Sequence, residues 1–183
     1  KKSPDGLTRS IIGELLTERD NKKKLRNTFP YGSDEYNLYD MQQNVLKVIM
    51  NSYYGVSGFA RFRLYDREIG SAVTSVGRAI IQHTRKIIND NGYEVIYGDT
   101  DSCFVQLPMV SQDETISIAR KLEDELNASY PGFAKETPGA DECYFSIKFE
   151  KIYRRFFQGG AKKRYAGHLT WKEGQEIDKI DIA

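Results

Sequence analysis

Two apolar runs of strand type flank a short acidic turn at residues 94–107, and this feature constrains the fold more than any other. The segment is EVIYGDTDSCFVQL, in which Asp99 and Asp101 stand one residue apart between the two runs. Aromatic and β-branched residues on both sides of a Gly-Asp-Thr-Asp turn predict an antiparallel β-hairpin. Two neighbouring carboxylates near an apolar core raise each other's cost of ionisation. The pattern therefore predicts a partner that compensates the two charges.

A shared divalent cation is one such partner. Residues i and i+2 of a strand face the same side, and at a tight turn the side chains of Asp99 and Asp101 still converge. Carboxylate oxygens are hard ligands, which favour Mg²⁺ or Mn²⁺ over zinc. The alternative is that GDTD is only a polar hairpin turn, an interpretation that the residue types alone favour. The metal hypothesis needs support from elsewhere in the chain.

Helical periodicity dominates the first half of the chain and returns once in the second half. It predicts helices at residues 7–26, 34–54, 66–90 and 112–130, with turn residues at 27–33. The first two should form an antiparallel helical hairpin. Alternation at 143–157 and a hairpin ending near residue 182 predict further strands. The expected fold class is α+β, with a long helical hairpin in residues 1–58 and an antiparallel sheet with covering helices in residues 59–183.

The apolar positions of these helices define the faces that should be buried. In the second helix the stripe passes through Tyr39, Leu46, Ile49 and Tyr53. The third helix should turn a longer stripe inward, made of Ile69, Val73, Val76, Ile80 and Ile87.

Overall composition excludes several classes of protein. Lys plus Arg total 27 and Asp plus Glu total 26, so the net charge of +1 indicates no bulk attraction to nucleic acid or membrane. Cys103 and Cys143 fit reduced thiols of a cytosolic protein. No apolar stretch approaches the ~18 residues of a membrane span, and we expect a cytoplasmic location without a membrane partner. Because the chain opens on Lys1 without an initiator methionine, we expect it to be part of a longer protein.

Polar and cationic side chains form two stripes on the first two helices. On the second helix they recur at i, i+4 and i+7, as Lys47, Asn51 and Tyr54. On the first helix the same spacing joins Arg19, Lys23 and Arg26. A solvated charged face would explain either stripe alone. Together, the two stripes predict a clamp for a polyphosphate, which arginine binds with two hydrogen bonds and lysine as a point charge.

Four motifs carry a resemblance to the family B DNA polymerases. KVIMNSYYG (47–55) fits their K-x-x-x-N-S-x-Y-G motif and YGDTDS (97–102) fits their second metal-binding motif. TSVGR (74–78) resembles their T-x-x-G-R segment and KKRYAG (162–167) resembles their K-K-x-Y motif. The chain looks most like archaeal replicative polymerases of the euryarchaeal type and is also similar to bacterial DNA polymerase II. The order and spacing of the motifs make the resemblance specific.

The resemblance implies a nucleotide-binding role for the helical hairpin, which corresponds to the fingers of the family. Arg19, Lys23 and Lys47 would hold the triphosphate of an incoming dNTP, and Lys47 would also protonate the leaving pyrophosphate. Asn51 would support the triphosphate. Tyr54 would press on the nascent base pair from its minor-groove side.

For the remainder, which corresponds to the C-terminal part of the palm, the resemblance implies a two-metal nucleotidyl transfer. Asp101 would be the principal ligand of Mg²⁺ (or Mn²⁺), Asp99 a looser ligand and Glu150 a weaker candidate for a third carboxylate. The 3′-hydroxyl of a primer would attack the α-phosphate in line, with one metal activating the hydroxyl and the other stabilising pyrophosphate.

Partners follow from the same resemblance. Lys163 and Tyr165 would hold the primer terminus, while Thr74 and Arg78 would touch the duplex, although helix packing explains Thr74 nearly as well. The implied partners are primed template DNA, dNTP, the remaining polymerase domains (exonuclease, N-terminal palm and thumb) and a sliding clamp. The implied place of work within the cytoplasm is the nucleoid.

One expected motif is absent from the sequence. The family's other essential aspartate lies in a D-x-x-S-L-Y-P-S type segment, and nothing in residues 1–183 matches it. We therefore expect this polypeptide alone neither to extend primers nor to bind duplex tightly. Two alternatives stay open at this stage: a catalytically inactive nucleic-acid-binding scaffold derived from a polymerase, and a palm-type nucleotidyl cyclase, which the cationic helices and KKRY argue against.

Overall fold

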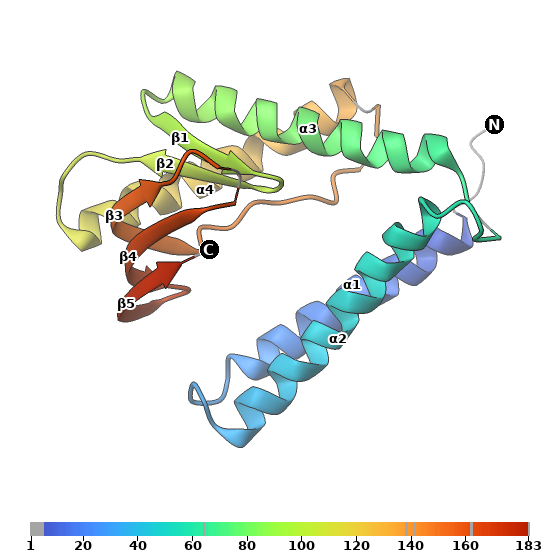
Figure 1. The fold of residues 1–183 in the computed structure, drawn as a ribbon, viewed down its shortest axis with the longest axis horizontal. Helices are drawn as coiled ribbons and strands as arrows, with labels where there is room; N and C mark the ends of the chain where they lie inside the picture. Colours follow the sequence, from blue (N-terminus) through green and yellow to red (C-terminus); the bar gives the residue numbers. More distant parts are fainter. Residues whose placement is uncertain (1–5, 64, 138, 141, 162, 183) are drawn as a thin grey trace. The chain divides into compact units, whose positions relative to one another are not determined.

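The computed structural model describes residues 6–63, 65–137, 139–140, 142–161 and 163–182, and it is α+β as expected. Its elements, labelled in Figure 1, are α1 (Leu7–Arg26), α2 (Asp34–Ser57), α3 (Arg67–Asp90), β1 (Glu94–Asp99), β2 (Ser102–Gln106), α4 (Gln112–Glu136), β3 (Lys151–Gln158), β4 (Tyr165–Lys172) and β5 (Gln175–Ile182). They fall into two compact units, Lys1–Val73 and Thr74–Ala183. The boundary expected between residues 1–58 and 59–183 stays a prediction, because it separates functional roles. The two units above are defined only by how compactly their residues pack. Within the described residues no helix is long and apolar enough to cross a membrane.

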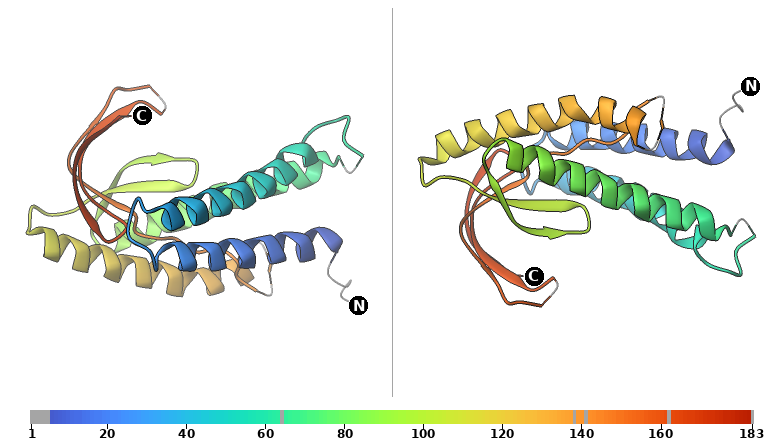
Figure 2. Two further views of the ribbon diagram at one scale, coloured as in Figure 1. Left: turned by 90° about the horizontal axis from the view of Figure 1, so that it is seen from below. Right: turned by 90° about the horizontal axis from the view of Figure 1, so that it is seen from above.

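In the first unit, α1 and α2 form the expected antiparallel hairpin and run side by side in the left view of Figure 2. Ser33 begins α2 as its N-cap, since its side chain accepts a hydrogen bond from the N–H of Tyr36. Near one end of the pair, the rings of Phe29 and Tyr39 stack with centroids 5.6 Å apart. Near the other, the hydroxyls of Thr8 and Tyr53 lie 2.8 Å apart. These contacts fix the antiparallel register of the two helices.

The buried seam of α2 differs in one position from the predicted stripe. Tyr39, Leu46 and Tyr53 are half-buried as predicted, but Ile49 is 46% exposed. Gln43 is buried instead, and Met50 is half-buried seven residues later. The prediction for Ile49 was wrong because the seam between two paired helices follows a narrow row of positions about 3.5 residues apart, and Ile49 lies beside that row.

In the second unit, the β1–β2 hairpin packs against α3 and α4. The two strands pair antiparallel, with Asp99 opposite Ser102 at the turn. The buried core joins Ile88 of α3, Val95 of β1, and Leu126 and Tyr130 of α4. Both cysteines are free and pack at the edge of this core. The predicted hairpin of residues 94–107 is therefore present and rests on helices on its apolar side.

Two predictions about α3 and α4 were wrong in detail. Ile69 and Val73 are about half exposed (51% and 49%), because the contacts of α3 with the core begin at Ile80. α4 was expected to end at Tyr130 but continues through Pro131 to Glu136. The continuation buries Ala134 to 1% exposure, and burial of apolar side chains offsets the backbone hydrogen bond that proline removes.

The remaining strands form a second sheet rather than an extension of the first. Its order is β3-β4-β5, all antiparallel, and Figure 2 shows it as a curved layer. The turn between β4 and β5 uses Glu173 and Gly174, both at positive φ. Upstream of β3, Asn127 of α4 exchanges two hydrogen bonds with the backbone of Ile147, so that segment is held on the helix without joining a strand.

Candidate active site

The turn after β1 gives the two aspartates different surroundings. Thr100 adopts a left-handed backbone (φ 51°), and the N–H of Asp101 donates to the carbonyl oxygen of Asp99. The Thr100 hydroxyl donates to Asp99 Oδ1 at 2.9 Å, and the Ser102 hydroxyl donates to the Asp99 carbonyl at 3.1 Å. Asp99 is therefore half-buried and oriented, whereas Asp101 is exposed at the tip of the turn.

The donor set of this turn fits a hard divalent cation. Asp99 shares one carboxylate oxygen with a neutral hydroxyl, and Asp101 offers an exposed carboxylate for which no partner occurs among the described residues. Carboxylate oxygens in a polar, accessible turn are suitable ligands for Mg²⁺ or Mn²⁺. In the part of the chain that the structure describes, no third His, Cys, Asp or Glu gathers with them. Glu150 lies exposed before β3 and is not brought into a group with the pair.

An aromatic cluster connects the back of this hairpin to the second sheet. Its members are Tyr97, Phe104, Tyr153, Phe156 and Tyr165, with ring centroids 4.8 to 6.4 Å apart. Tyr165 contacts Phe104 at 5.3 Å, and the backbone N–H of Lys163 donates to the Tyr97 phenol oxygen at 3.1 Å. The structure thus brings Lys163 and Tyr165, at the start of β4, onto the hairpin that bears the two aspartates.

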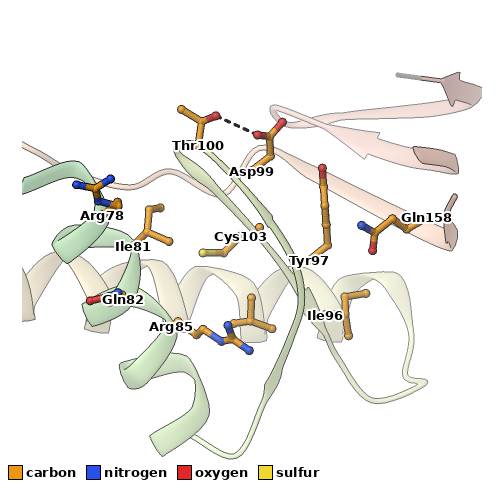
Figure 3. A pocket seen from close by; sticks show the side chains of 12 residues that line it. Arg78, Ile81, Gln82, Arg85, Ile96, Tyr97, Asp99, Thr100, Cys103 and Gln158 are labelled. Atoms are coloured by element: carbon orange, nitrogen blue, oxygen red, sulfur yellow. Dashed lines mark hydrogen bonds between the residues drawn. The ribbon is translucent and has the colours of Figure 1, made fainter. Parts of the chain in front are cut away.

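A pocket of about 550 Å³ opens on the same hairpin, between β1, α3 and the end of β3 (Figure 3). Asp99 and Thr100 line it from the turn, and Arg78 lines it from α3, so two predicted site residues meet here. Thr74 is exposed on α3 and does not line the pocket. The predicted roles of Arg78 and Asp99 stay predictions, but the two side chains share one cavity.

Three polar residues of this pocket were not predicted from the sequence: Gln82, Arg85 and Gln158. Arg78, Gln82 and Arg85 stand at i, i+4 and i+7, the same spacing as the polar stripe that begins at Lys47. This spacing would have predicted Gln82 and Arg85 on α3. The thiol of Cys103 also faces the pocket. Burial raises its pKa, against a smaller opposing effect of the Arg85 charge, so it is a protonated thiol at neutral pH.

The helical hairpin carries the other predicted group. Lys47, Asn51 and Tyr54 are exposed on α2, and Arg19 and Lys23 are half-buried on α1. These positions leave the polar stripe of α2 accessible to a ligand.

Arg26, which sequence spacing put in line with Arg19 and Lys23, is paired within the hairpin. Its guanidinium donates to Asp40 at 2.7 Å. This hydrogen bond holds the pKa of Asp40 below its ordinary value, against the opposing effect of burial. Arg26 therefore neutralises an acidic side chain of α2.

Comparison with known proteins gives a consistent result across the chain. The family model described as DNA polymerase family B matches residues 1–182. DNA polymerase 2 of Aeropyrum pernix is 36% identical over 167 residues, which cover 91% of this chain and 18% of that protein. The DNA polymerase delta catalytic subunit of Glycine max is 35% identical over 187 residues, which cover 96% of this chain and 16% of that protein.

A solved structure extends the comparison to the fold. The family B DNA polymerase of the hyperthermophilic archaeon Pyrobaculum calidifontis superimposes with a TM-score of 0.63 at 32% sequence identity, covering 100% of this chain and 20% of that one. The chain spans less than a fifth of the length of the curated relatives named above.

Proposed function

Because this chain belongs to DNA polymerase family B, we propose that it supplies the fingers and the C-terminal part of the palm of a DNA-directed DNA polymerase. The complete enzyme would transfer nucleotides from dNTP to the 3′-hydroxyl of a primer under the direction of a template. The observation that carries the proposal is the two-aspartate turn, with Lys163 and the start of β4 bound to the same hairpin. The turn is suited to metal-assisted phosphoryl chemistry, and the strand is suited to a nucleic-acid backbone.

Asp101 and Asp99 would hold the divalent cations. The exposed carboxylate of Asp101 supports its role as the principal ligand, and the hydroxyl bound to Asp99 Oδ1 supports a looser role for Asp99. Mg²⁺ or Mn²⁺ bound there would supply activation of the primer hydroxyl and neutralisation of the charge that develops on the phosphates. Glu150 as a further ligand stays a prediction.

The cationic and polar stripes of the helical hairpin would bind the incoming nucleotide. Arg19, Lys23 and Lys47 would hold the triphosphate, because guanidinium and ammonium groups compensate its negative charge. Lys47 would also donate a proton to the leaving pyrophosphate. Asn51 would hydrogen-bond the triphosphate, and the exposed ring of Tyr54 would contact the nascent base pair.

Duplex DNA would bind along the second unit. Lys163 and Tyr165 would contact the primer terminus, and Arg78, with Thr74 near it on α3, would contact the backbone. Phosphate contacts of this kind are strongly salt-dependent. The partners would be the remaining polymerase domains and a sliding clamp, and the enzyme would work at the nucleoid.

The decisive experiment is primer extension by the complete polymerase that contains this segment, wild type against Asp101→Ala, with Mg²⁺ and dNTP. Removing a metal-binding carboxylate should lower the rate by about a thousandfold or more while primer binding persists. Asp113→Ala, on an exposed acidic residue in the first turn of α4, is the matched control and should extend normally.

Two further results bear on the proposal. Normal extension by Asp101→Ala would favour the inactive scaffold over the enzyme. Detectable extension by the 183-residue polypeptide alone would contradict our proposal that this part is inactive without the segment bearing the other aspartate.

A further inference from the structure

A chain of polar contacts runs between α1 and α2. Gln43 is only 4% exposed and uses both ends of its amide. Its Oε1 accepts a hydrogen bond from Nε of Arg19 at 3.2 Å, and its Nε2 donates to Asp40 Oδ1 at 3.2 Å. Asp40 in turn accepts from Arg26 at 2.7 Å. A buried amide with partners on both sides has one orientation.

The chemistry of the neighbours dictates that orientation. Arginine has only donors, so it requires the amide oxygen of Gln43. Asp40 is ionised at neutral pH, because the hydrogen bond from Arg26 lowers the pKa of its carboxyl, and a carboxylate requires the amide NH₂. The amide therefore cannot flip without losing both bonds, and it holds the guanidinium of Arg19 in a fixed place.

The bond to Gln43 uses Nε of Arg19 and leaves the two terminal nitrogens of the guanidinium available to a ligand. Among the described residues, its two terminal nitrogens have no partner. The two terminal nitrogens are one of the two pairs of donors with which arginine binds two oxygens of a phosphate side by side. An arginine held in this way loses little conformational entropy when a phosphate arrives.

Gln43 lies on α2 one helical turn before the first α2 residue of the proposed nucleotide site. Lys47 follows Gln43 by one helical turn and is exposed. Because the bonds Thr8–Tyr53 and Arg19–Gln43 fix an antiparallel register, Arg19 of α1 lies one turn from the level of Lys47.

We propose that Gln43 is a positioning residue for triphosphate binding: it fixes Arg19 so that the terminal nitrogens of the guanidinium face the phosphates of the incoming dNTP. This inference rests on the proposed function of the hairpin. It assigns Gln43 an action through Arg19, with no direct contact to the nucleotide.

The test is a double-mutant cycle in the complete polymerase. The dissociation constant of the next correct dNTP is measured on a primer that ends in a dideoxynucleotide, which separates binding from chemistry. Gln43→Leu, similar in size but unable to hydrogen-bond, should weaken dNTP binding about tenfold. In the Arg19→Ala background, which is itself weakened, Gln43→Leu should add almost nothing.

A matched control is Asn44→Ala. Asn44 is exposed and donates to the same Asp40 at 3.2 Å, and among the hydrogen bonds of the described residues none joins it to Arg19, so dNTP binding should not change. If Gln43→Leu does not fold, Gln43→Asn keeps the amide but is one methylene too short to hold Nε, and the same weakening is expected.

Three results would overturn the inference. Wild-type dNTP affinity in a folded Gln43 variant, with weakened binding in Arg19→Ala, would refute it and leave the proposed function intact. An equal effect of the Gln43 variant with and without Arg19 would show that Gln43 acts through the fold. Unchanged affinity in Arg19→Ala would refute the proposed role of Arg19 together with this inference.

Discussion

The phenol oxygen of Tyr97 accepts a hydrogen bond of 3.1 Å from the backbone N–H of Lys163, across a sequence separation of 66 residues. Lys163 has a left-handed backbone (φ 63°), a conformation that costs a residue other than glycine about 1 kcal/mol. The bond helps to hold this conformation and ties the start of β4 to the hairpin of the two aspartates. The proposed primer contact and the proposed metal site are thereby mechanically connected.

Tyr97→Phe should lower the free energy of unfolding by about 1 kcal/mol, since it removes the acceptor and keeps the ring. The ring contact with Phe104, at 5.4 Å, should persist. Urea unfolding of the chain measures the change. Tyr31→Phe is the matched control, because Tyr31 is 73% exposed and its loss of a hydroxyl should change little. Equal stability of wild type and Tyr97→Phe would mean that the bond contributes nothing.

Lys163→Ala should weaken binding of primed DNA by the complete polymerase and reduce the slope of log affinity against log salt by about one. The physical reason is the loss of one phosphate-neutralising charge. Titrations of labelled primer–template at several salt concentrations measure both quantities. Lys121→Ala, an exposed lysine of α4 whose side chain lies 3.8 Å from Glu125, is the control. An unchanged slope would exclude Lys163 from the DNA-binding surface.

Lys47→Arg should separate binding of the nucleotide from chemistry. Arginine keeps the positive charge, so the affinity for dNTP should stay within about threefold, but it does not release a proton at neutral pH, so the rate at saturating dNTP should fall by about a hundredfold. Single-turnover incorporation by the complete polymerase gives both values. A normal rate would remove Lys47 as the proton donor and leave it a binding role.

Thr84→Val should destabilise the second unit by about 1 to 3 kcal/mol, because it leaves a buried hydroxyl without its partner. Thr84 is 0% exposed, and its hydroxyl lies 2.7 Å from that of Tyr130. Thr84→Ser keeps the hydroxyl and should lose less stability than Thr84→Val. Adding Tyr130→Phe to Thr84→Val should recover part of the loss, and urea unfolding of wild type, Thr84→Val, Tyr130→Phe and the double variant completes the cycle. Strict additivity would contradict a direct interaction.

His83 should make stability depend on pH. It stacks on Phe133 with centroids 4.4 Å apart and shares a hydrogen bond of 3.0 Å with Ser129, both on α4. Burial, followed by the charge of Lys86, lowers the pKa of His83 below its ordinary value of 6.5, with Glu136 opposing the shift.

Because the folded state then binds this proton less readily than the unfolded state, His83 contributes stability that is present above pH 6.5 and is lost as the pH falls through the lower folded pKa. Unfolding of wild type and His83→Gln at about pH 7.5 and about pH 5.5 tests this, and the variant should lose less stability on acidification. An identical loss in both proteins would assign the pH dependence to other groups.

Local sequence determined the elements and indicated the chemistry that we propose for them. The helical periods predicted α1 and α2, and the strand–turn–strand pattern predicted β1 and β2, because amphipathic periodicity and turn residues act over a few neighbouring positions. The motifs around Asp101 and Lys47 indicated the family without reference to the fold, since they are contiguous in the chain.

Tertiary structure decided what depends on neighbours far apart in the chain. Periodicity put Ile49 in the seam, but the approach of α1 buried Gln43 instead. The helix predicted at residues 112–130 continues through Pro131 to Glu136, where burial of Ala134 favours continuation. The bond from Lys163 to Tyr97 joins segments with no common pattern. Packing of distant surfaces has no local periodicity, so only the folded chain determines which polar groups meet and which apolar positions remain exposed.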